Sequence, residues 1–191
     1  MALTSSNMMN LGTVAPDFEL IDIVSKKVMK YENIAGSKAT VLMFICNHCP
    51  YVVHVMPEIF KIIKEFKAKG VGFVAISSND IVAYPHDGPD HMKDFAEKWE
   101  MDCPYLFDES QDVARAYDAA CTPDFYIFSE NKKLIYRGRL DESRPKVDNP
   151  APLNGKDIRG ALNAHLAGQL ISEIQFPSMG CNIKWKNPDQ N

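Results

Sequence analysis

Residues 39–50 have the sequence ATVLMFICNHCP, and this stretch decides the fold. Its first part, 39–45, is a continuous apolar run rich in strand-forming residues. Such a run predicts a strand that is buried on both faces of a sheet. The run leads directly into a Cys-x-x-Cys pair, Cys46 and Cys49, so the two thiols should lie at the end of that strand.

The residues that follow the pair predict a helix and a second buried strand. Apolar side chains recur at intervals of three and four from residue 50 to about residue 69, which is typical of an amphipathic helix. Gly70 should end this helix, and the apolar run 71–77 should form the next strand. Residues 39–77 therefore predict a strand–helix–strand unit whose strands are parallel and joined by a right-handed crossover.

Outside this unit, the same patterns predict shorter elements on both sides. In chain order we expect a hairpin of strands 18–23 and 27–31, a helix 89–99, a strand 104–107, a helix 111–119, a hairpin of strands 124–128 and 134–137, and a helix capped by Asp157 and ended by Gly168. The chain then divides into a loosely held lead-in, residues 1–14, one α/β domain, residues 15–168, and a C-terminal extension, residues 169–191, that packs on the domain.

The composition excludes several classes of function. The chain has 191 residues, 46% of them apolar and 24% charged, as in a folded domain. A net charge of -4 provides no basic field, so we expect no nucleic-acid partner. We expect no membrane partner either, because no apolar run approaches the ~18 residues of a span and the start lacks the features of a signal peptide. Five cysteines, an odd number, argue against a disulfide scaffold and predict a cytoplasmic location.

A Cys-x-x-Cys pair between a buried strand and a helix has a specific chemical use. The positive end of the helix should lower the pKa of Cys46 and make it a nucleophilic thiolate. Cys49, expected one turn inside the helix, can then attack the mixed disulfide and release the reduced substrate. The alternatives are two core cysteines or half of a zinc site, but zinc requires four ligands and His48 and His54 complete such a site poorly. We therefore expect no metal, and a dithiol needs no organic cofactor.

Several motifs together resemble one known superfamily. These are the element APDF at Ala15–Phe18, the run FICNHCPYV from Phe44, the pair Thr122-Pro123 before a strand, and the tail GCNIKWK at Gly180–Lys186. The chain is identified by them as a member of the thioredoxin superfamily, on its peroxiredoxin-like and TlpA-like branch of AhpC/TSA-type redoxins, and is similar to an uncharacterised bacterial subgroup of that branch.

The resemblance implies a fold and a site. The fold is a thioredoxin-like α/β domain: a central mixed sheet with helices on both faces, an N-terminal hairpin and a C-terminal tail. Pro123 resembles the cis-proline of the superfamily, which leaves the backbone of Thr122 free to pair with a bound peptide strand. His48 resembles a histidine that stabilises the thiolate in disulfide isomerases, so the pair should be more oxidising than that of thioredoxin.

The implied function is thiol-disulfide oxidoreduction. Its partners would be a disulfide-containing protein or small molecule and a recycling thiol reductant. The first alternative is a peroxiredoxin-like thiol peroxidase with an antioxidant role. Aligning the peroxidatic cysteine with Cys49 puts Cys46 where these enzymes have a threonine and Leu42 where they have a proline, so we expect slow reaction with peroxide. The second alternative is a zinc-binding or redox-inert interaction module.

The other cysteines allow more than one interpretation. Cys103 is expected to be structural, and Cys121 is either a small core residue or a third redox partner. Cys181 is a resolving thiol if the tail folds over the active site, or else packs beside Trp185. Four polar residues could be interpreted as metal ligands: His86, Asp87, Asp90 and His91. They lie around a loop and the start of a helix, where polar residues are expected in any case, so we do not expect a metal site.

Overall fold

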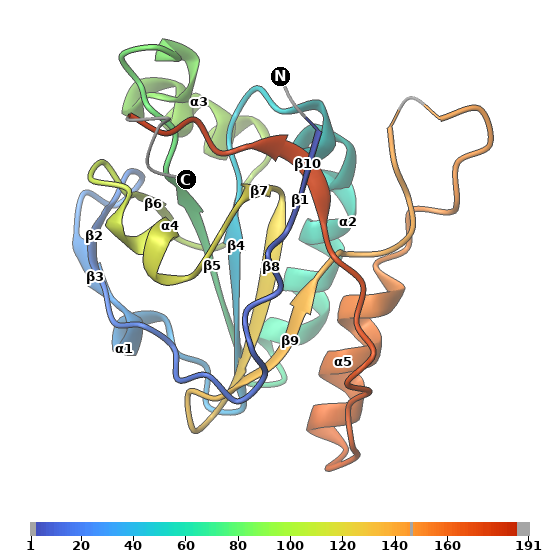
Figure 1. The fold of residues 1–191 in the computed structure, drawn as a ribbon. Helices are drawn as coiled ribbons and strands as arrows, with labels where there is room; N and C mark the ends of the chain where they lie inside the picture. Colours follow the sequence, from blue (N-terminus) through green and yellow to red (C-terminus); the bar gives the residue numbers. More distant parts are fainter. Residues whose placement is uncertain (1–2, 146, 187–191) are drawn as a thin grey trace.

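A seven-stranded mixed sheet forms the centre of the computed structural model, which describes residues 3–145 and 147–186 (Figure 1). The strand order is β3-β2-β6-β5-β4-β8-β9. Strands β4, β5 and β6 run parallel and the other neighbours are antiparallel. The strands are β2 (Glu19–Asp22), β3 (Val28–Lys30), β4 (Ala39–Phe44), β5 (Val71–Ser77), β6 (Tyr105–Phe107), β8 (Asp124–Ser129) and β9 (Leu134–Gly138).

The central strand β4 separates two hydrophobic cores. All six of its residues are buried, and they alternate between the two sides of the sheet. Val41 and Met43 pack into the larger core, whereas Leu42 and Phe44 pack into the smaller one. This alternation explains the unbroken apolar run in the sequence, because neither face of the strand meets water.

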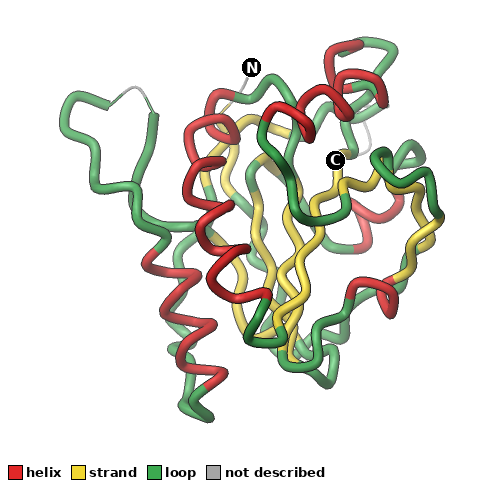
Figure 2. The backbone as a smooth tube through the Cα atoms, turned by 180° about the vertical axis from the view of Figure 1, so that it is seen from behind, coloured by secondary structure: helices red, strands yellow, loops and turns green. Residues whose placement is uncertain are grey.

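Helices cover both faces of the sheet, as expected. Three of them contribute side chains to the larger core: α2 (Pro50–Lys67), α3 (Pro89–Lys98) and α5 (Lys156–Leu166). Figure 2 views the molecule from behind, with α2 in front of the strands and α5 beside them at the left. The two short helices α1 (Tyr31–Ile34) and α4 (Asp112–Ala116) pack in the smaller core on the opposite face. The α/β class with helices on both faces is therefore confirmed.

A second sheet joins the two ends of the described chain. It has three strands in the order β1-β10-β7, namely β1 (Leu3–Ser5), β10 (Met179–Asn182) and β7 (Cys121–Thr122) (Figure 1). Residues 1–14 were expected to be a loosely held lead-in, and this is wrong for residues 3–5 because they pair with β10. A strand this short has no periodicity of its own, and its hydrogen bonds come from a segment far away in the sequence. The local sequence therefore does not predict it.

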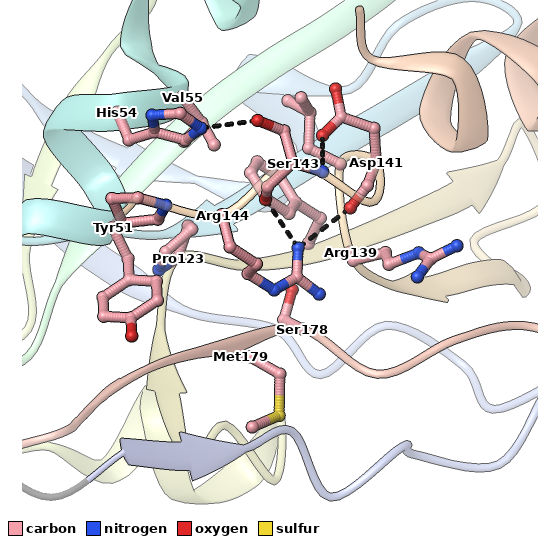
Figure 3. Close-up of a pocket in the computed structure, with 13 residues that line it drawn as sticks. Tyr51, His54, Val55, Pro123, Arg139, Asp141, Ser143, Arg144, Ser178 and Met179 are labelled. Atoms are coloured by element: carbon pink, nitrogen blue, oxygen red, sulfur yellow. Dashed lines mark hydrogen bonds between the residues drawn. The ribbon is translucent and has the colours of Figure 1, made fainter. Parts of the chain in front are cut away.

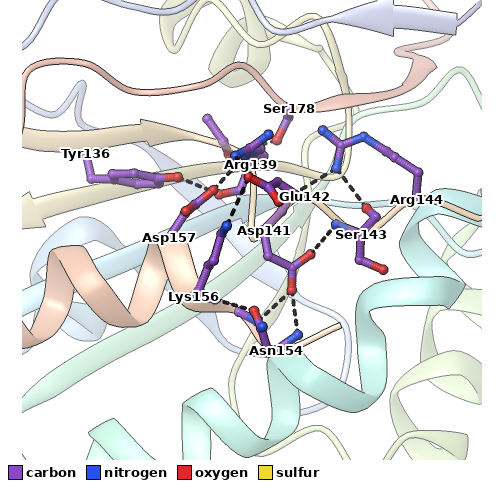
Figure 4. Close-up of polar contacts among 12 residues, drawn as sticks. Tyr136, Arg139, Asp141, Glu142, Ser143, Arg144, Asn154, Lys156, Asp157 and Ser178 are labelled. Atoms are coloured by element: carbon purple, nitrogen blue, oxygen red, sulfur yellow. Dashed lines mark hydrogen bonds and ion pairs between the residues drawn. The ribbon is translucent and has the colours of Figure 1, made fainter. Parts of the chain in front are cut away.

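The C-terminal helix begins two residues earlier than expected. Gly155, in the left-handed region with a φ of 60°, is the N-cap, so the expected capping role of Asp157 is wrong. The Asp157 carboxylate instead accepts a hydrogen bond of 2.6 Å from Arg139 Nε (Figure 4). Asp141 holds the two ends of the loop before the helix. Its carboxylate accepts hydrogen bonds from the backbone amides of Ser143, Asn154 and Gly155, at 2.8, 2.7 and 2.6 Å.

Within residues 3–145 and 147–186, no helix combines the length and the apolar character that a bilayer span requires.

Candidate functional site

The Cys-x-x-Cys segment is the loop between β4 and α2, with Cys49 as the N-cap of the helix. The helix begins at residue 50, as its periodicity predicted, but the expected positions of Cys46 at its start and of Cys49 one turn inside it are wrong. Pro50 supplies the physical reason. It has no N–H to donate to the carbonyl of Cys46, so the helix begins at Pro50 itself and does not extend back through the pair.

Both sulfurs lie against Thr122, the residue before the proline expected to be cis. Cys46 Sγ is 3.4 Å from Thr122 Oγ1, and Cys49 Sγ is 3.2 Å from the carbonyl oxygen of Thr122. The Thr122–Pro123 peptide bond is cis, in agreement with the resemblance. The structure therefore brings together Cys46, Cys49, Thr122 and Pro123, four of the five residues predicted for the site.

The fifth predicted residue, His48, is also at the site. Its Nδ1 lies 2.8 Å from Asp87 Oδ2, which is an ion-pair distance, although the ring is not aligned for a hydrogen bond. A ring nitrogen of His48, the sulfur of Cys46 and a carboxylate oxygen of Asp87 lie within 4.8 Å of one another. The His48 ring also stacks on Tyr84, with ring centroids 6.0 Å apart.

Asp87 fixes the shape of this loop. It is fully buried and accepts hydrogen bonds from the backbone N–H of Asn47 at 2.9 Å and from Nδ2 of Asn79 at 2.7 Å. The oxygen of the Asn47 side chain accepts a further bond of 2.9 Å from the Tyr105 hydroxyl. Hydrogen bonds to a buried carboxylate are strong. Asp87 therefore holds the backbone of the Cys-x-x-Cys loop through Asn47 and keeps the ring of His48 close to Cys46.

The acidity order of the two thiols is the reverse of our expectation. The hydrogen bond that Cys46 gives to Cys49, its burial and the Asp87 carboxylate raise the pKa of Cys46 well above its usual value. The same hydrogen bond lowers the pKa of Cys49 to about 5, against the effect of burial and with further help from Cys181 and the amide of Val52. Cys46 was also expected to be the more exposed thiol, but both residues are buried, at 1% and 0% exposure.

A third sulfur completes the site. Cys181 Sγ, on β10, lies 3.0 Å from Cys49 Sγ. Strand β10 is antiparallel to β7, with Cys181 opposite Thr122 and Asn182 opposite Cys121. Of the two interpretations of Cys181 in the sequence, the tail folding over the site is the one that the structure has.

Within the described residues, the other two cysteines, Cys103 and Cys121, form no hydrogen bond with Cys46 or Cys49. Burial raises the pKa of Cys103 to about 12 and also raises the pKa of Cys121. The thiol of Cys121 donates a weak hydrogen bond to the carbonyl of Pro123 at 3.7 Å. Both thiols are therefore protonated near neutral pH, which makes them poor nucleophiles.

A small cavity adjoins Pro123 (Figure 3). His54 and Ser143 meet across it, with 2.6 Å between Nε2 and Oγ, and Arg144 donates to the carbonyl oxygens of Ser143 and Asp141 at 2.8 and 3.0 Å. Its volume of about 20 Å³ has room for about one water molecule. In this conformation the cavity cannot accommodate a small-molecule disulfide.

The described residues contain one group that has the donor chemistry for a metal ion, Cys46 with His48 and Asp87. A structural zinc ion takes four ligands, and this group supplies three. The oxygens of Asp87 are already accepting from Asn47 and Asn79. The donor set therefore fits a hydrogen-bonded thiol site better than a closed zinc site.

Comparison with known proteins gives the family. A strand–loop–helix dithiol beside a cis-proline defines the thioredoxin-like class. Within that class, residues 11–137 match the model of the AhpC/TSA family. The chain belongs to this family.

Individual relatives agree with this assignment. An uncharacterized conserved protein from Geobacillus kaustophilus is 50% identical, with a TM-score of 0.93 and 97% of each chain covered. A putative thiol:disulfide interchange protein DsbE from Chlorobium tepidum is 22% identical and shares the fold, with a TM-score of 0.63 over 82% of this chain and 98% of that one. Thiol-disulfide oxidoreductase ResA from Bacillus thuringiensis subsp. konkukian is 20% identical over 76% of this chain and 79% of its own.

Sequence reasoning missed one residue of the site and left another open. Asp87 was attributed to an ordinary polar loop, because nothing in its neighbourhood along the chain connects it to Cys46. Cys181 was left between two interpretations. The quoted tail motif at Gly180–Lys186 was the available signal for it, since an apolar tail with a cysteine must pack somewhere on the domain.

Proposed function

We propose that the protein is a thiol-disulfide oxidoreductase whose active dithiol is Cys46 and Cys49. The observation that carries the proposal is the contact of both sulfurs with Thr122, beside a cis-proline and at the start of a helix. This arrangement combines a low-pKa thiol with a second thiol within reach, which thiol-disulfide exchange requires. The relatives named ResA have this activity in their names and support the same assignment.

The pKa values suggest how the roles are divided. Cys49 carries the thiolate and attacks one sulfur of a substrate disulfide, whose other sulfur leaves as a thiolate and takes up a proton. Cys46, after losing its proton, attacks Cys49 Sγ in the mixed disulfide and releases the second substrate thiol. The substrate gains two electrons and the protein is left with a Cys46–Cys49 disulfide. A thiol reductant must then recycle it, and the cytoplasm is the compartment that we propose.

A thiol peroxidase is the second candidate. The position of Cys49 at a helix N-cap, with its pKa lowered to about 5, favours it. The residues expected to polarise peroxide are nevertheless replaced by Cys46 and Leu42, and Leu42 is buried in the smaller core on the other face of the sheet. Peroxide would therefore meet fewer donors than a peroxidase provides.

Oxidation of the reduced protein distinguishes these candidates. We would mix it with glutathione disulfide or hydrogen peroxide, quench with acid, alkylate, and locate the oxidised residues by mass spectrometry. We expect glutathione disulfide to produce the Cys46–Cys49 disulfide and peroxide to react at the rate of an ordinary thiolate. Cys103→Ser should behave like the native protein.

Three results would contradict the proposal. Rapid peroxide oxidation confined to Cys49 would establish the peroxidase. Zinc retained by anaerobically purified protein, with both thiols unreactive, would establish the metal-holding module. Full oxidation by glutathione disulfide in a variant with both Cys46→Ser and Cys49→Ser would show that the active thiols lie elsewhere.

A further inference from the structure

The cis-proline edge of the site is occupied by the protein's own chain. In thioredoxin-like proteins the backbone beside the cis-proline is expected to pair with a substrate strand. Here β10 forms that pairing, with Cys181 directly opposite Thr122. The side chain that a substrate cysteine would present to the dithiol is therefore supplied by Cys181.

The distance between the two sulfurs fits exchange better than simple packing. Non-bonded carbon atoms lie about 3.5–4.0 Å apart, and sulfur is larger than carbon, yet Cys181 Sγ and Cys49 Sγ are separated by 3.0 Å. A disulfide bond is about 2.05 Å long, so a movement of about 1 Å would form it.

The sequence of β10 permits this close approach. A side-chain carbon at Gly180 would overlap the carbonyl group of Thr122 and would press on the nitrogen of Pro123. These are backbone atoms, so they cannot turn aside as a side chain could. Glycine at this position is therefore what lets Cys181 reach the dithiol.

Hydrogen bonds at both ends of β10 hold the strand in place. Before the strand, the amide of Ser178 donates to the hydroxyl oxygen of Ser6 at 2.9 Å, and the amide of Ser6 donates to the carbonyl oxygen of Ser178 at 3.0 Å. After the strand, the amide of Lys184 donates to Asn79 Oδ1 at 2.9 Å, and Asn79 Nδ2 in turn donates to Asp87. The strand and the Cys-x-x-Cys loop thus share one hydrogen-bond network.

We propose that Cys181 is a third redox-active thiol, which exchanges with Cys49 inside the molecule. This inference rests on the proposed function, because that function generates the Cys46–Cys49 disulfide. Cys181 loses its proton and attacks Cys49 Sγ; the bond between Cys49 and Cys46 breaks, and its electron pair leaves with Cys46, which takes up a proton. The protein then carries a Cys49–Cys181 disulfide, with no net oxidation or reduction.

Two neighbouring groups favour this step. Thr122 Oγ1 is 3.4 Å from Cys46 Sγ, within hydrogen-bond distance, so its hydroxyl can donate to the sulfur that takes up the electron pair as the bond breaks. Burial, followed by the hydrogen bond to Cys49, raises the pKa of Cys181 to about 12 in the reduced protein. Because formation of the Cys46–Cys49 disulfide removes the negative charge of Cys49, which also raises the pKa of Cys181, Cys181 becomes more acidic when it is needed as the nucleophile.

Peptide mapping of Cys46→Ser tests the proposal. In this variant Cys49 cannot pair with residue 46. Trypsin cleaves after Lys38, Lys61, Arg159 and Lys184, so Cys49 and Cys181 fall in the separate peptides 39–61 and 160–184. After incubation with glutathione disulfide and an acid quench, we expect these peptides to be cross-linked in most molecules, at a yield independent of protein concentration. Adding Cys181→Ser should abolish the cross-link, and adding Cys103→Ser should leave it unchanged.

The opposite outcome is equally clear. If Cys46→Ser accumulates Cys49 bound to glutathione while Cys181 remains free to alkylate, the proposal is wrong. The native protein separates this failure from a failure of the proposed function, because the Cys46–Cys49 disulfide appears there as a loss of two hydrogens within peptide 39–61. If the Cys46–Cys49 disulfide forms in the native protein but the Cys49–Cys181 cross-link does not form in Cys46→Ser, the proposed role of Cys181 is wrong and the proposed function stands.

Discussion

Pro50 is the residue that places the two thiols differently with respect to α2. It starts α2 immediately after the dithiol and leaves Cys49 as the N-cap, close to the amide of Val52. Cys46 is left outside the helix and next to the Asp87 carboxylate, which opposes a second negative charge. Pro50 therefore sets where the two cysteines lie, and the hydrogen bond between them has the largest effect on both pKa values.

The first prediction concerns the pH dependence of the Cys49 thiolate. Its pKa of about 5 lies below the ordinary value of 9.0, so thiolate absorbance should appear as the pH rises through about 5 and be nearly complete at neutral pH. Cys46→Ala removes the donor with the largest effect. A hydrogen bond to a charged group contributes about 1.5–3 kcal/mol, so the midpoint should rise by roughly 1–2 pKa units.

Ultraviolet titration of the reduced protein measures this midpoint. Cys49→Ser should remove the low transition, and Cys103→Ser should retain it. If the low transition instead disappears in Cys46→Ala and persists in Cys49→Ser, then Cys46 is the acidic thiol, as the sequence alone suggested.

At the scale of elements, β10 is the least predictable part of the structure and the part that closes the site. Its four residues have no periodicity of their own, and their partners are residues 3–5 and 121–122. The sheet pairing is consistent with Gly180, because only a residue without a side chain fits against the Thr122–Pro123 peptide.

The second prediction compares two glycine substitutions. Gly180→Ala forces a carbon into the backbone of Thr122, and overpacking of this kind costs about 1–3 kcal/mol. Gly160→Ala is the matched control, because it lies in α5 with nothing within 4 Å of the added carbon. It should stabilise the helix by about 0.5–1 kcal/mol.

Urea unfolding under reducing conditions gives the free energy of unfolding for both variants. We expect a lower midpoint than native for Gly180→Ala and a higher one for Gly160→Ala. A Gly180→Ala variant as stable as the native protein would show that β10 does not lie as close to the cis-proline as described.

The elements that sequence reasoning predicted are those with local signals. The apolar run of β4, the helical period of α2 and the turn between β8 and β9 are each encoded within a few neighbouring residues. The strands β1, β7 and β10 were missed because two to four residues contain no period, and only pairing across the molecule makes them strands.

The same distinction applies to the site. Cys46, Cys49 and His48 are adjacent along the chain, and the resemblance contributed Thr122 and Pro123. Asp87 and Cys181 reach the dithiol only through folding, 38 and 132 residues from Cys49 along the sequence. Their effect on the two pKa values was therefore invisible, and the predicted acidity order was wrong.

At the scale of the whole molecule, the first and last strands of the described chain, β1 and β10, pair side by side (Figure 1). Strand β10 carries Cys181 against the active dithiol. Cys46 and Cys49 are both buried in this state, and the cavity beside Pro123 is too small for a disulfide substrate. Exchange with an external disulfide therefore requires β10 to move, or Cys181 to pass the disulfide outward. In both cases the segment that follows α5 controls access to the redox centre.

The central claim is that Cys46 and Cys49 form a redox-active dithiol with a stabilised thiolate. A thiolate is the reduced form, so stabilising it makes the disulfide a stronger oxidant. The relevant thiol of thioredoxin has a pKa near ~7 and that of a strong periplasmic oxidase near ~3.5, and their potentials are about -270 and -120 mV. With a pKa of about 5, Cys49 lies between them.

Equilibration with glutathione redox buffers, followed by an acid quench and mass spectrometry of peptide 39–61, measures this potential directly. We predict a two-electron transition that converts Cys46 and Cys49 to a disulfide, with a midpoint between about -270 and -120 mV. A midpoint below that of thioredoxin would contradict the assigned thiolate, and free thiols at every buffer ratio would contradict the redox function itself.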